Sequence, residues 1–266
     1  DRLKVGHDSW IGYAAAIVAR DKGLFSKQGL TVETVTFSGP GDTLPPLIAG
    51  HLDVAFTTLH NVALMAGKGQ DNLVAIYLLD TSNGADAIVS AKEITATAQL
   101  KGRKVAVTMD EVNHMLLLVA LSAAGLKPDE VKLVDMSAED GGAALLAGKV
   151  DAAVTWEPWV TRARANGGNV LFTSANTPNL ILDAVVVTKD SLAKNGPALA
   201  KLLRGIDAGR DFLVKNPNEA KPVLVKWLKV KPGEVDAMLA GDRIYGLAEN
   251  RVLFGTQAVS YTHLTL

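Results

Sequence analysis

The chain has no cysteine among its 266 residues, which excludes disulfide bonds, thiolate nucleophiles and thiolate metal sites. It also lacks an apolar run near the roughly 20 residues of a membrane-spanning helix, because the longest candidate, Met115–Gly125, is interrupted by Ser122. The charges almost cancel, with 27 Lys and Arg against 28 Asp and Glu, so no global field would hold the protein on nucleic acid or anionic lipid. We therefore expect a soluble protein that recognises its ligand locally.

Catalytic and nucleotide-binding motifs are missing too. The sequence has no G-x-S-x-G elbow, no G-x-x-x-x-G-K-[ST] phosphate loop and no G-x-G-x-x-G after a predicted strand. His60 and His114 each lie near a predicted helix start, without a second ligand at metal-binding spacing. These absences predict no catalytic residue, no cofactor and no metal, and they favour a binding protein over an enzyme.

Short apolar runs alternate with longer segments of helical period, which predicts an α/β protein, and the length suffices for two lobes. Ten strands are predicted, at residues 3–5, 31–37, 53–57, 73–79, 87–90, 104–109, 131–134, 151–155, 170–173 and 184–188. Strand signals cease after about Asp190, and residues 191–215, 217–228 and 232–240 are predicted as helices. Earlier helices are predicted at residues 11–22 and 113–124, each ending at a glycine.

An internal repeat supports two similar lobes. Residues 47–58 and 145–156 share Leu, Ala, Gly, Asp, Ala and Thr at equivalent positions, and in each copy a helix ends at Gly before a buried strand. Ligands of open α/β sheets bind at the carboxyl ends of the strands, so two facing lobes predict a cleft. The expected lining follows the predicted strands: His7 and Trp10, residues 57–60, 80–86 and 109–113, Trp156 and Glu157, and Asp183.

Five segments in this order resemble a known family: Trp10-Ile-Gly-Tyr, Lys22-Gly-Leu-Phe25, Leu47-Ile-Ala-Gly-x-x-Asp53, Asp80-x-Ser-x-Gly-Ala-Asp86 and Thr155-Trp-Glu-Pro-Trp159. Together they resemble the nitrate, sulfonate, taurine and thiamine-precursor group of type II periplasmic binding proteins, over about residues 2–257. The resemblance implies a two-lobed type II fold with two crossover strands, near Asp86-Ala87 and Asp183-Ala184. Lobe 1 would comprise residues 1–86 and 184–266, and lobe 2 residues 87–183.

The resemblance also implies a function outside the cytoplasmic membrane, in the periplasm or an equivalent extracytoplasmic setting. The protein would be a monomer that closes over a small molecule and delivers it to an ABC permease with its ATPase. Two features depart from the family. Asp110-Glu111 stands where small residues usually precede the first long helix of the second lobe, and residues 259–266 match nothing expected there.

The candidate ligand-binding residues are Trp10, Thr57, Thr58, Asp80, Ser82, Asn83, Asp86, Asn113, Trp156, Glu157 and Asp183. Glu157 would pair with a ligand cation and Trp156 would cover its carbon atoms, although packing and a favourable helix-dipole position explain the same residues. Trp10 is interpreted equally well as core packing or as ligand stacking. Asp80, Asp86 and Asp183 either bind ligand or serve the turns at the crossovers. Asn113 is a good N-cap by type.

Acidic residues dominate these positions, since Asp110 and Glu111 join Asp80, Asp86, Glu157 and Asp183 without a Lys or Arg among them. This favours an amine-bearing or zwitterionic ligand, such as taurine or an alkanesulfonate-like molecule, over a simple anion. Thiamine-precursor binding and a pyrimidine-forming enzyme of the same fold are the alternatives, although that enzyme would need a cysteine-rich motif. A transcription-regulator effector domain would need a helix-turn-helix ahead of Leu3.

Overall fold

The computed structural model describes residues 1–255, so the unusual segment 259–266 lies outside the described residues. The chain divides into two compact units. Unit 1 contains Asp1–Thr81, Leu182–Pro232 and the chain from Arg243 onward, and unit 2 contains Ser82–Ile181 and Gly233–Asp242. The lobe boundaries expected near Asp86 and Asp183 stay a prediction. The units divide a few residues earlier, and the short segment 233–242 joins unit 2 rather than unit 1.

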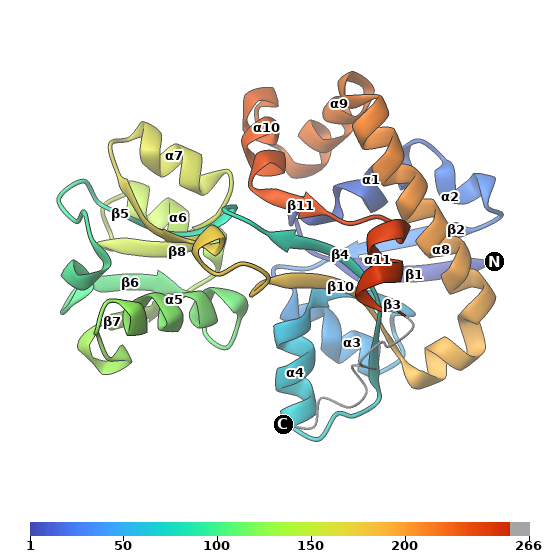
Figure 1. The fold of residues 1–266 in the computed structure, drawn as a ribbon, viewed down its shortest axis with the longest axis horizontal. Helices are drawn as coiled ribbons and strands as arrows, with labels where there is room; N and C mark the ends of the chain where they lie inside the picture. The colour runs from blue at the N-terminus through green and yellow to red at the C-terminus, as the bar shows by residue number, and fades with distance from the viewer. Residues whose placement is uncertain (256–266) are drawn as a thin grey trace. The chain divides into compact units, whose positions relative to one another are not determined.

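Unit 1 is built on a six-stranded sheet of order β11-β4-β10-β3-β1-β2 (Figure 1). Its strands are β1 (Arg2–His7), β2 (Thr31–Thr36), β3 (Val54–Thr58), β4 (Leu73–Ser82), β10 (Leu182–Thr188) and β11 (Asp242–Ile244). β1 pairs in parallel with β2 and β3, whereas β10 runs antiparallel to both β3 and β4. The carboxyl ends of β1 and β3 therefore lie at the same sheet edge as the first residues of β10.

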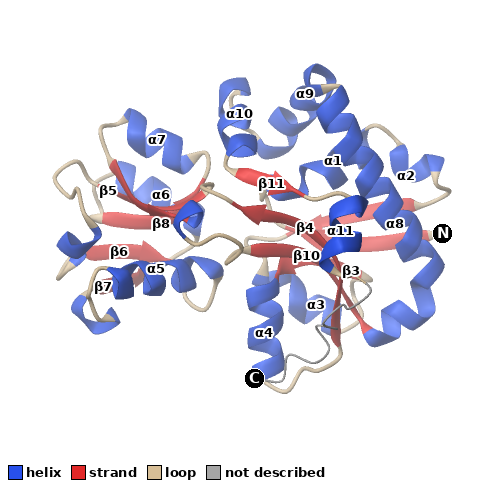
Figure 2. Ribbon diagram, viewed as in Figure 1, coloured by secondary structure: helices blue, strands red, loops and turns tan. Residues whose placement is uncertain are grey.

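Helices pack against this sheet (Figure 2): α1 (Ala14–Asp21), α2 (Leu24–Lys27), α3 (Leu44–Ile48), α4 (Leu59–Gly67), α8 (Lys189–Lys215), α9 (Pro217–Leu228) and α11 (Leu247–Leu253). Most of the α1 residues are fully buried. α8 crosses α1 closely, because Gly209 brings its backbone against the carbonyl of Ala15. A Cβ at Gly209 would overlap that carbonyl oxygen and lie 2.9 Å from the Cβ of Ala19.

Gly209→Ala should therefore destabilise the protein by about 2 to 3 kcal/mol, because α8 must move away from α1 to relieve the overlap. Gly67→Ala is the matched control, since Gly67 also lies in a helix and a Cβ there would meet nothing within 4 Å. The control should be neutral or stabilising by less than about 1 kcal/mol. Urea unfolding of both variants checks the prediction, which equal midpoints for Gly209→Ala and the wild type would contradict.

Unit 2 contains a five-stranded sheet of order β7-β6-β8-β5-β9. Its strands are β5 (Asp86–Ser90), β6 (Lys104–Val107), β7 (Lys132–Asp135), β8 (Ala152–Trp156) and β9 (Asn169–Thr173), and its helices are α5 (Val112–Ala123), α6 (Ala138–Leu146), α7 (Trp159–Ala165) and most of α10 (Pro232–Ala240). β6, β7 and β8 are parallel, and β5 runs antiparallel to β8 and β9. Leu116, Leu117 and Leu121 of α5 pack against β6 and β8 in one apolar core.

Two hydrogen bonds of the internal repeat occur at equivalent positions in both units. The backbone N–H of Lys4 donates to Asp53 Oδ2 at 2.8 Å, and that of Lys104 donates to Asp151 Oδ2 at 2.8 Å. The Thr57 hydroxyl donates to the carbonyl of Pro40 at 2.9 Å, and the Thr155 hydroxyl donates to that of Ala138 at 2.6 Å. The glycines before the turn, Gly50 and Gly148, have φ values of 74° and 68°. The repeated residues thus fix one helix–turn–strand unit twice.

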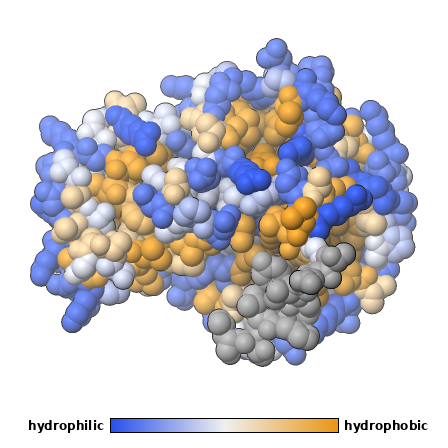
Figure 3. All heavy atoms as spheres, in the orientation of Figure 1, coloured by the Kyte–Doolittle hydropathy of each residue, from blue (hydrophilic) through white to orange (hydrophobic). Residues whose placement is uncertain are grey.

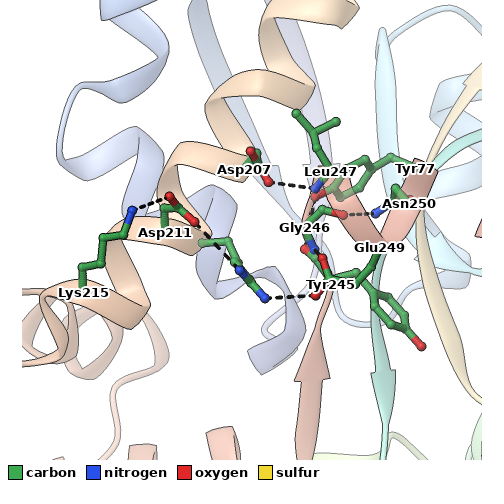
Figure 4. A network of polar contacts seen from close by, with 10 residues as sticks. Tyr77, Asp207, Asp211, Lys215, Tyr245, Gly246, Leu247, Glu249 and Asn250 are labelled. Carbon is green, nitrogen blue, oxygen red and sulfur yellow. Dashed lines mark hydrogen bonds and ion pairs between the residues drawn. The ribbon is translucent and has the colours of Figure 1, made fainter. Parts of the chain in front are cut away.

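A polar network fastens α11 to β4 and α8 (Figure 4). The Asn250 side chain accepts from the N–H of Leu78 at 2.7 Å and donates to its carbonyl at 2.9 Å, as a neighbouring strand would. Asp207 accepts from the N–H of Leu247 at 2.7 Å, and Arg210 forms an ion pair with Glu249 at 3.1 Å. The Tyr77 hydroxyl donates to the Tyr245 carbonyl, and burial raises the pKa of Tyr77. Side chains therefore complete the sheet edge beyond β11.

All ten predicted strands are present, but the expectation that strands end before residue 190 is wrong. β11 comprises Asp-Arg-Ile, which has too little apolar alternation to be seen in sequence. The first predicted helix also begins differently, as a 3₁₀ turn over Ile11–Tyr13.

Within residues 1–255, no helix combines the length and apolar character needed to cross a membrane. The face drawn in Figure 3 mixes polar and apolar side chains.

Candidate functional site

In unit 1, buried carboxylates gather around the turn that follows β1. Asp8 Oδ1 accepts from the backbone N–H of Trp10 at 2.9 Å, and Asp80 Oδ1 accepts from its indole Nε1 at 3.2 Å. Both carboxylates are at most 2% exposed, and Trp10 is 6% exposed. A Cβ at Gly12 would overlap the Asp80 carboxylate, so this position must be glycine for Asp80 to lie there. Trp10 is thus a buried donor to Asp80.

A second buried contact joins Tyr13 to Asp183. The Tyr13 hydroxyl donates to Asp183 Oδ1 at 2.6 Å, and Asp183 pairs with Asp80 across the β10–β4 ladder. Burial, followed by the charges of Asp183, Asp8 and Asp80, raises the pKa of Tyr13 well above its usual value. Tyr13 therefore stays protonated and serves Asp183 as a donor. Tyr13 belongs to the sequence motif that begins at Trp10, but the sequence indicates no role for it, because its hydrogen-bond partner lies 170 residues away.

His7 ends β1 beside these groups. Its Nδ1 lies 2.7 Å from the carbonyl oxygen of Asp8, and its ring packs near Tyr13, Phe56 and Trp227. Burial is the main cause that lowers the pKa of His7. A neutral imidazole is therefore favoured, and it does not neutralise the neighbouring carboxylates.

Three other candidate residues have local structural roles. Thr57 is fully buried and donates its only hydroxyl hydrogen to Pro40, so we leave it out of the proposed site. Thr58 is the N-cap of α4, where its hydroxyl accepts from the N–H of Asn61 at 3.2 Å. Asn83 is exposed, and its backbone N–H donates to the carbonyl of Gly241 at 2.9 Å. Binding of a ligand by Thr58 or the Asn83 side chain stays a prediction.

In unit 2, Asp86 begins β5 directly opposite Trp156, the last residue of β8. It is 2% exposed, and burial raises the pKa of its carboxyl to about 6 despite a hydrogen bond with Ser82 that lowers it. Ser82 Oγ lies 2.8 Å from Ser174 Oγ, which also accepts from the N–H of Gly84 at 2.7 Å. Ser174 was not predicted, although it directly follows the predicted strand 170–173, where the carboxyl-end rule would have indicated it. Asp86 thus lies among hydroxyl groups, and within residues 1–255 its carboxylate forms no ion pair.

Glu157 follows Trp156 at the same edge and is 8% exposed. Its Oε2 accepts from the backbone N–H of Thr161 at 3.0 Å, and its Oε1 accepts from the Thr161 hydroxyl at 2.9 Å. These bonds support the alternative interpretation, in which the Glu157 carboxylate stabilises the start of α7. Each oxygen keeps a second lone pair, so the same carboxylate can still accept from a ligand.

The prediction of Asn113 as an N-cap is wrong. Glu111 is the N-cap of α5, because Asp110 has a left-handed backbone with a φ of 58° and turns the chain one residue before it. Asn113 lies inside the first turn and is 1% exposed. Its Nδ2 has no hydrogen-bond partner among the described residues. A buried amide donor without an acceptor is costly, and a ligand oxygen would relieve that cost.

Unit 2 therefore brings together Asp86, Trp156, Glu157 and Asn113 at one sheet edge, where the parallel strands β6, β7 and β8 end. Unit 1 brings together Trp10, Asp80 and Asp183 at the corresponding edge, with Asp8 and Tyr13 added. Across residues 1–255, no group of three or more His, Cys, Asp or Glu side chains is placed to hold a metal ion. The arrangement suits recognition of polar groups by carboxylates, hydroxyls and an amide.

The chain belongs to the NMT1/THI5-like family, which matches residues 10–220. The taurine-binding periplasmic protein of Escherichia coli K12 is 29% identical over 240 residues, which cover 85% of this chain and 73% of that protein. A putative binding protein of Brucella abortus is 27% identical over 240 residues, with 88% of this chain and 74% of that protein covered.

The crystal structure of the periplasmic aliphatic sulphonate binding protein SsuA from Escherichia coli has the same fold. Its TM-score is 0.79 at 23% sequence identity, and the match covers 92% of this chain and 86% of that chain. The predicted α/β fold class of periplasmic binding proteins and the family resemblance are thereby confirmed.

Proposed function

We propose that the protein is the extracytoplasmic solute-binding component of an ABC importer and binds a small, amine-bearing or zwitterionic molecule. Family membership and the taurine- and sulphonate-binding proteins that it resembles support the general class. The bound molecule leaves unchanged, as expected of a binding protein like the relatives that the chain resembles. Binding is coupled to hinge closure of the two units, and the closed protein delivers its ligand to a membrane permease with its ATPase.

The single observation that carries the ligand class is the buried carboxylate of Asp86, which lies opposite Trp156 and forms no ion pair within residues 1–255. Burying a carboxylate without a cation costs free energy, and a ligand ammonium group placed there would offset that cost. The Trp156 indole suits the methylene groups next to an ammonium. Asn113 Nδ2, as an unpaired donor, suits the oxygen atoms at the other end of a zwitterion. A bare anion would meet the carboxylates of Asp86 and Glu157 without a cation to offset them.

A thermal-shift screen tests this proposal. Taurine, alkanesulfonates, nitrate, thiamine precursors, amino acids and small amines are each added at saturating concentration, because a specific ligand raises the unfolding temperature by mass action. We expect amine-bearing zwitterions to raise it, by an amount equivalent to about 3 kcal/mol at a hundredfold excess over Kd, and nitrate to leave it unchanged.

Two further measurements on a screen hit complete the test. Mass spectrometry should recover the ligand with unchanged mass, and solution scattering should show a smaller radius of gyration with ligand than without it. A chemically altered ligand would reject the binding-protein assignment. An unchanged radius of gyration would reject hinge closure, and a response to nitrate alone would reject the amine-bearing ligand class.

A further inference from the structure

Helix α10 belongs to unit 2 although the chain on both sides of it belongs to unit 1. Gly233–Asp242 packs with residues 82–181, whereas Leu182–Pro232 and the chain from Arg243 form part of unit 1. The sequence places this segment far along the chain from every strand of unit 2. Hydrogen bonds and an ion pair attach the segment to unit 2 at both of its ends, and each attachment lies close in the chain to a candidate site residue.

The first end of α10 is attached to α7. Glu234 accepts from Arg162 Nε at 2.8 Å and from its Nη2 at 3.2 Å, which is a two-point ion pair. The Arg162 guanidinium also lies 4.8 Å from the ring centre of Trp159, whose side chain fills the space that a Cβ at Gly142 would need. The neighbouring Thr161 holds both oxygens of Glu157. Two neighbouring residues of α7 therefore make these contacts: Arg162 with α10 and Thr161 with Glu157.

The second end of α10 is attached to the turn before Asp86. The carbonyl of Gly241 accepts from the N–H of Asn83 at 2.9 Å and from that of Ala85 at 3.0 Å. A Cβ at Gly241 would lie 2.8 Å from the nitrogen of Ala85, so only glycine allows this approach. The carbonyl of Ala85 in turn accepts from the N–H of Glu157 at 3.2 Å. The two loops that carry Asp86 and Glu157 are thus joined directly and again through α10.

We propose that α10 is a brace for the polar edge of unit 2 and that Arg162 is a positioning residue for ligand binding. Through Glu234, Arg162 fixes α10, and through Gly241, α10 fixes the turn of residues 82–85 that places Asp86 beside Glu157. This role in binding rests on the proposed function. Ligand affinity should then depend on an ion pair that touches no ligand, because a loosened turn must be ordered again at each binding event.

Amide hydrogen exchange measured by NMR tests the brace without any ligand. In Arg162→Met, the amide protons of Asn83 and Ala85 should exchange at least about tenfold faster than in the wild type, because their acceptor is no longer held. The amide of Lys104, which is bound to Asp151 in the same unit, reports general opening and should exchange at its wild-type rate. Arg164→Met is the matched control, since Arg164 lies on the same helix and is exposed. It should change none of the three rates.

Charge exchange provides the rescue. The double variant Arg162→Glu, Glu234→Arg should restore slow exchange at Asn83 and Ala85, whereas each single variant should not. Gly241→Ala displaces the turn from the other end and should also accelerate both amides. Unchanged exchange of Asn83 and Ala85 in both Arg162→Met and Gly241→Ala would overturn the brace, and so would equal acceleration at Lys104.

Calorimetric titration with taurine then measures the effect on affinity. Arg162→Met and Gly241→Ala should bind taurine roughly fivefold more weakly than the wild type, and the charge-exchanged double variant should recover most of that loss. If the wild type binds no taurine, the taurine-like ligand is rejected while the exchange rates still decide the brace. If the wild type binds and both variants bind equally well, the positioning role of Arg162 is rejected.

Discussion

Asp86→Asn is expected to raise the free energy of unfolding by about 1 to 3 kcal/mol at pH 7.5, an unusual direction for a change in a buried polar residue. The reason is that burial raises the pKa of Asp86 from 3.8 to about 6, so the folded protein pays to hold an ionised carboxylate above that pH. Asparagine has nearly the same shape and carries no charge. The amide oxygen of asparagine can accept from the Ser82 hydroxyl in place of the carboxylate, and the bond from the backbone N–H of residue 86 to Ser82 Oγ is unaffected.

The sign of the pH dependence follows from proton binding. A carboxyl whose pKa is raised on folding binds its proton more tightly in the folded state, so its stability contribution is complete below about pH 3.8 and is lost as the pH rises through 6. The advantage of Asp86→Asn over the wild type should therefore be large at pH 7.5 and small at pH 4. Urea unfolding of both proteins at these two values measures it.

Asp129→Asn is the control, because Asp129 is exposed in the same unit and should give equal unfolding curves at both pH values. A wild type as stable as Asp86→Asn at pH 7.5 would show that the buried carboxylate costs nothing. Asp86→Asn should also lose affinity for an amine-bearing ligand. Gained stability together with lost binding is the usual sign that a strained group is kept for function.

The repeat explains why so much of the fold could be predicted from the sequence. Buried strands, left-handed glycines and a turn aspartate depend on residues close together in the chain, and the pairs Lys4–Asp53 and Lys104–Asp151 follow from the same local unit in each half. The carboxyl-end rule led to Trp156 and Glu157, and Trp156 is the last residue of β8. Asp86, which was expected in the first lobe, instead begins β5 of unit 2 opposite Trp156.

The features of the fold and site that could not be predicted depend on contacts between residues far apart in the sequence, or on a backbone conformation that the residue types do not reveal. Nothing near Tyr13 indicates Asp183 as its partner, and nothing near Glu234 indicates Arg162. Asn113 has the ideal residue type for an N-cap, yet the left-handed Asp110 moves the helix start to Glu111. β11 contains only three residues, which is too short for an alternating apolar pattern to indicate a strand. Side chains such as Asn250 supply the further hydrogen bonds along the edge of β4.

The second large effect is expected for Glu157→Gln, which should weaken binding of the amine-bearing ligand by roughly 30-fold or more. Removing one partner of a desolvated ion pair costs on the order of 2 to 5 kcal/mol, which corresponds to at least that factor. Glutamine keeps one oxygen to accept from the N–H of Thr161, so the start of α7 should survive and the unfolding temperature should change little.

Thr161→Val separates ligand binding by Glu157 from its structural contact. Valine removes only the hydroxyl that donates to Glu157 Oε1, and it leaves the carboxylate charge and the backbone hydrogen bond in place. If Glu157 binds the ligand cation, Thr161→Val should change Kd by less than about threefold, since one neutral hydrogen bond contributes about 1 kcal/mol or less here. If Glu157 only supports α7, both variants should alter stability alike and leave Kd unchanged.

Trp156→Ala completes the series on the neighbouring residue. Loss of the indole face should cost on the order of 1 to 2 kcal/mol in binding through cation–π and packing contacts, which is less than the loss in Glu157→Gln. Calorimetric titration of the wild type and the three variants with the same ligand gives this order directly. Tight nitrate binding by the wild type, or unchanged amine affinity in Glu157→Gln, would reject Glu157 as the cation partner, because a carboxylate that pairs with an ammonium cannot lose its charge without loss of affinity.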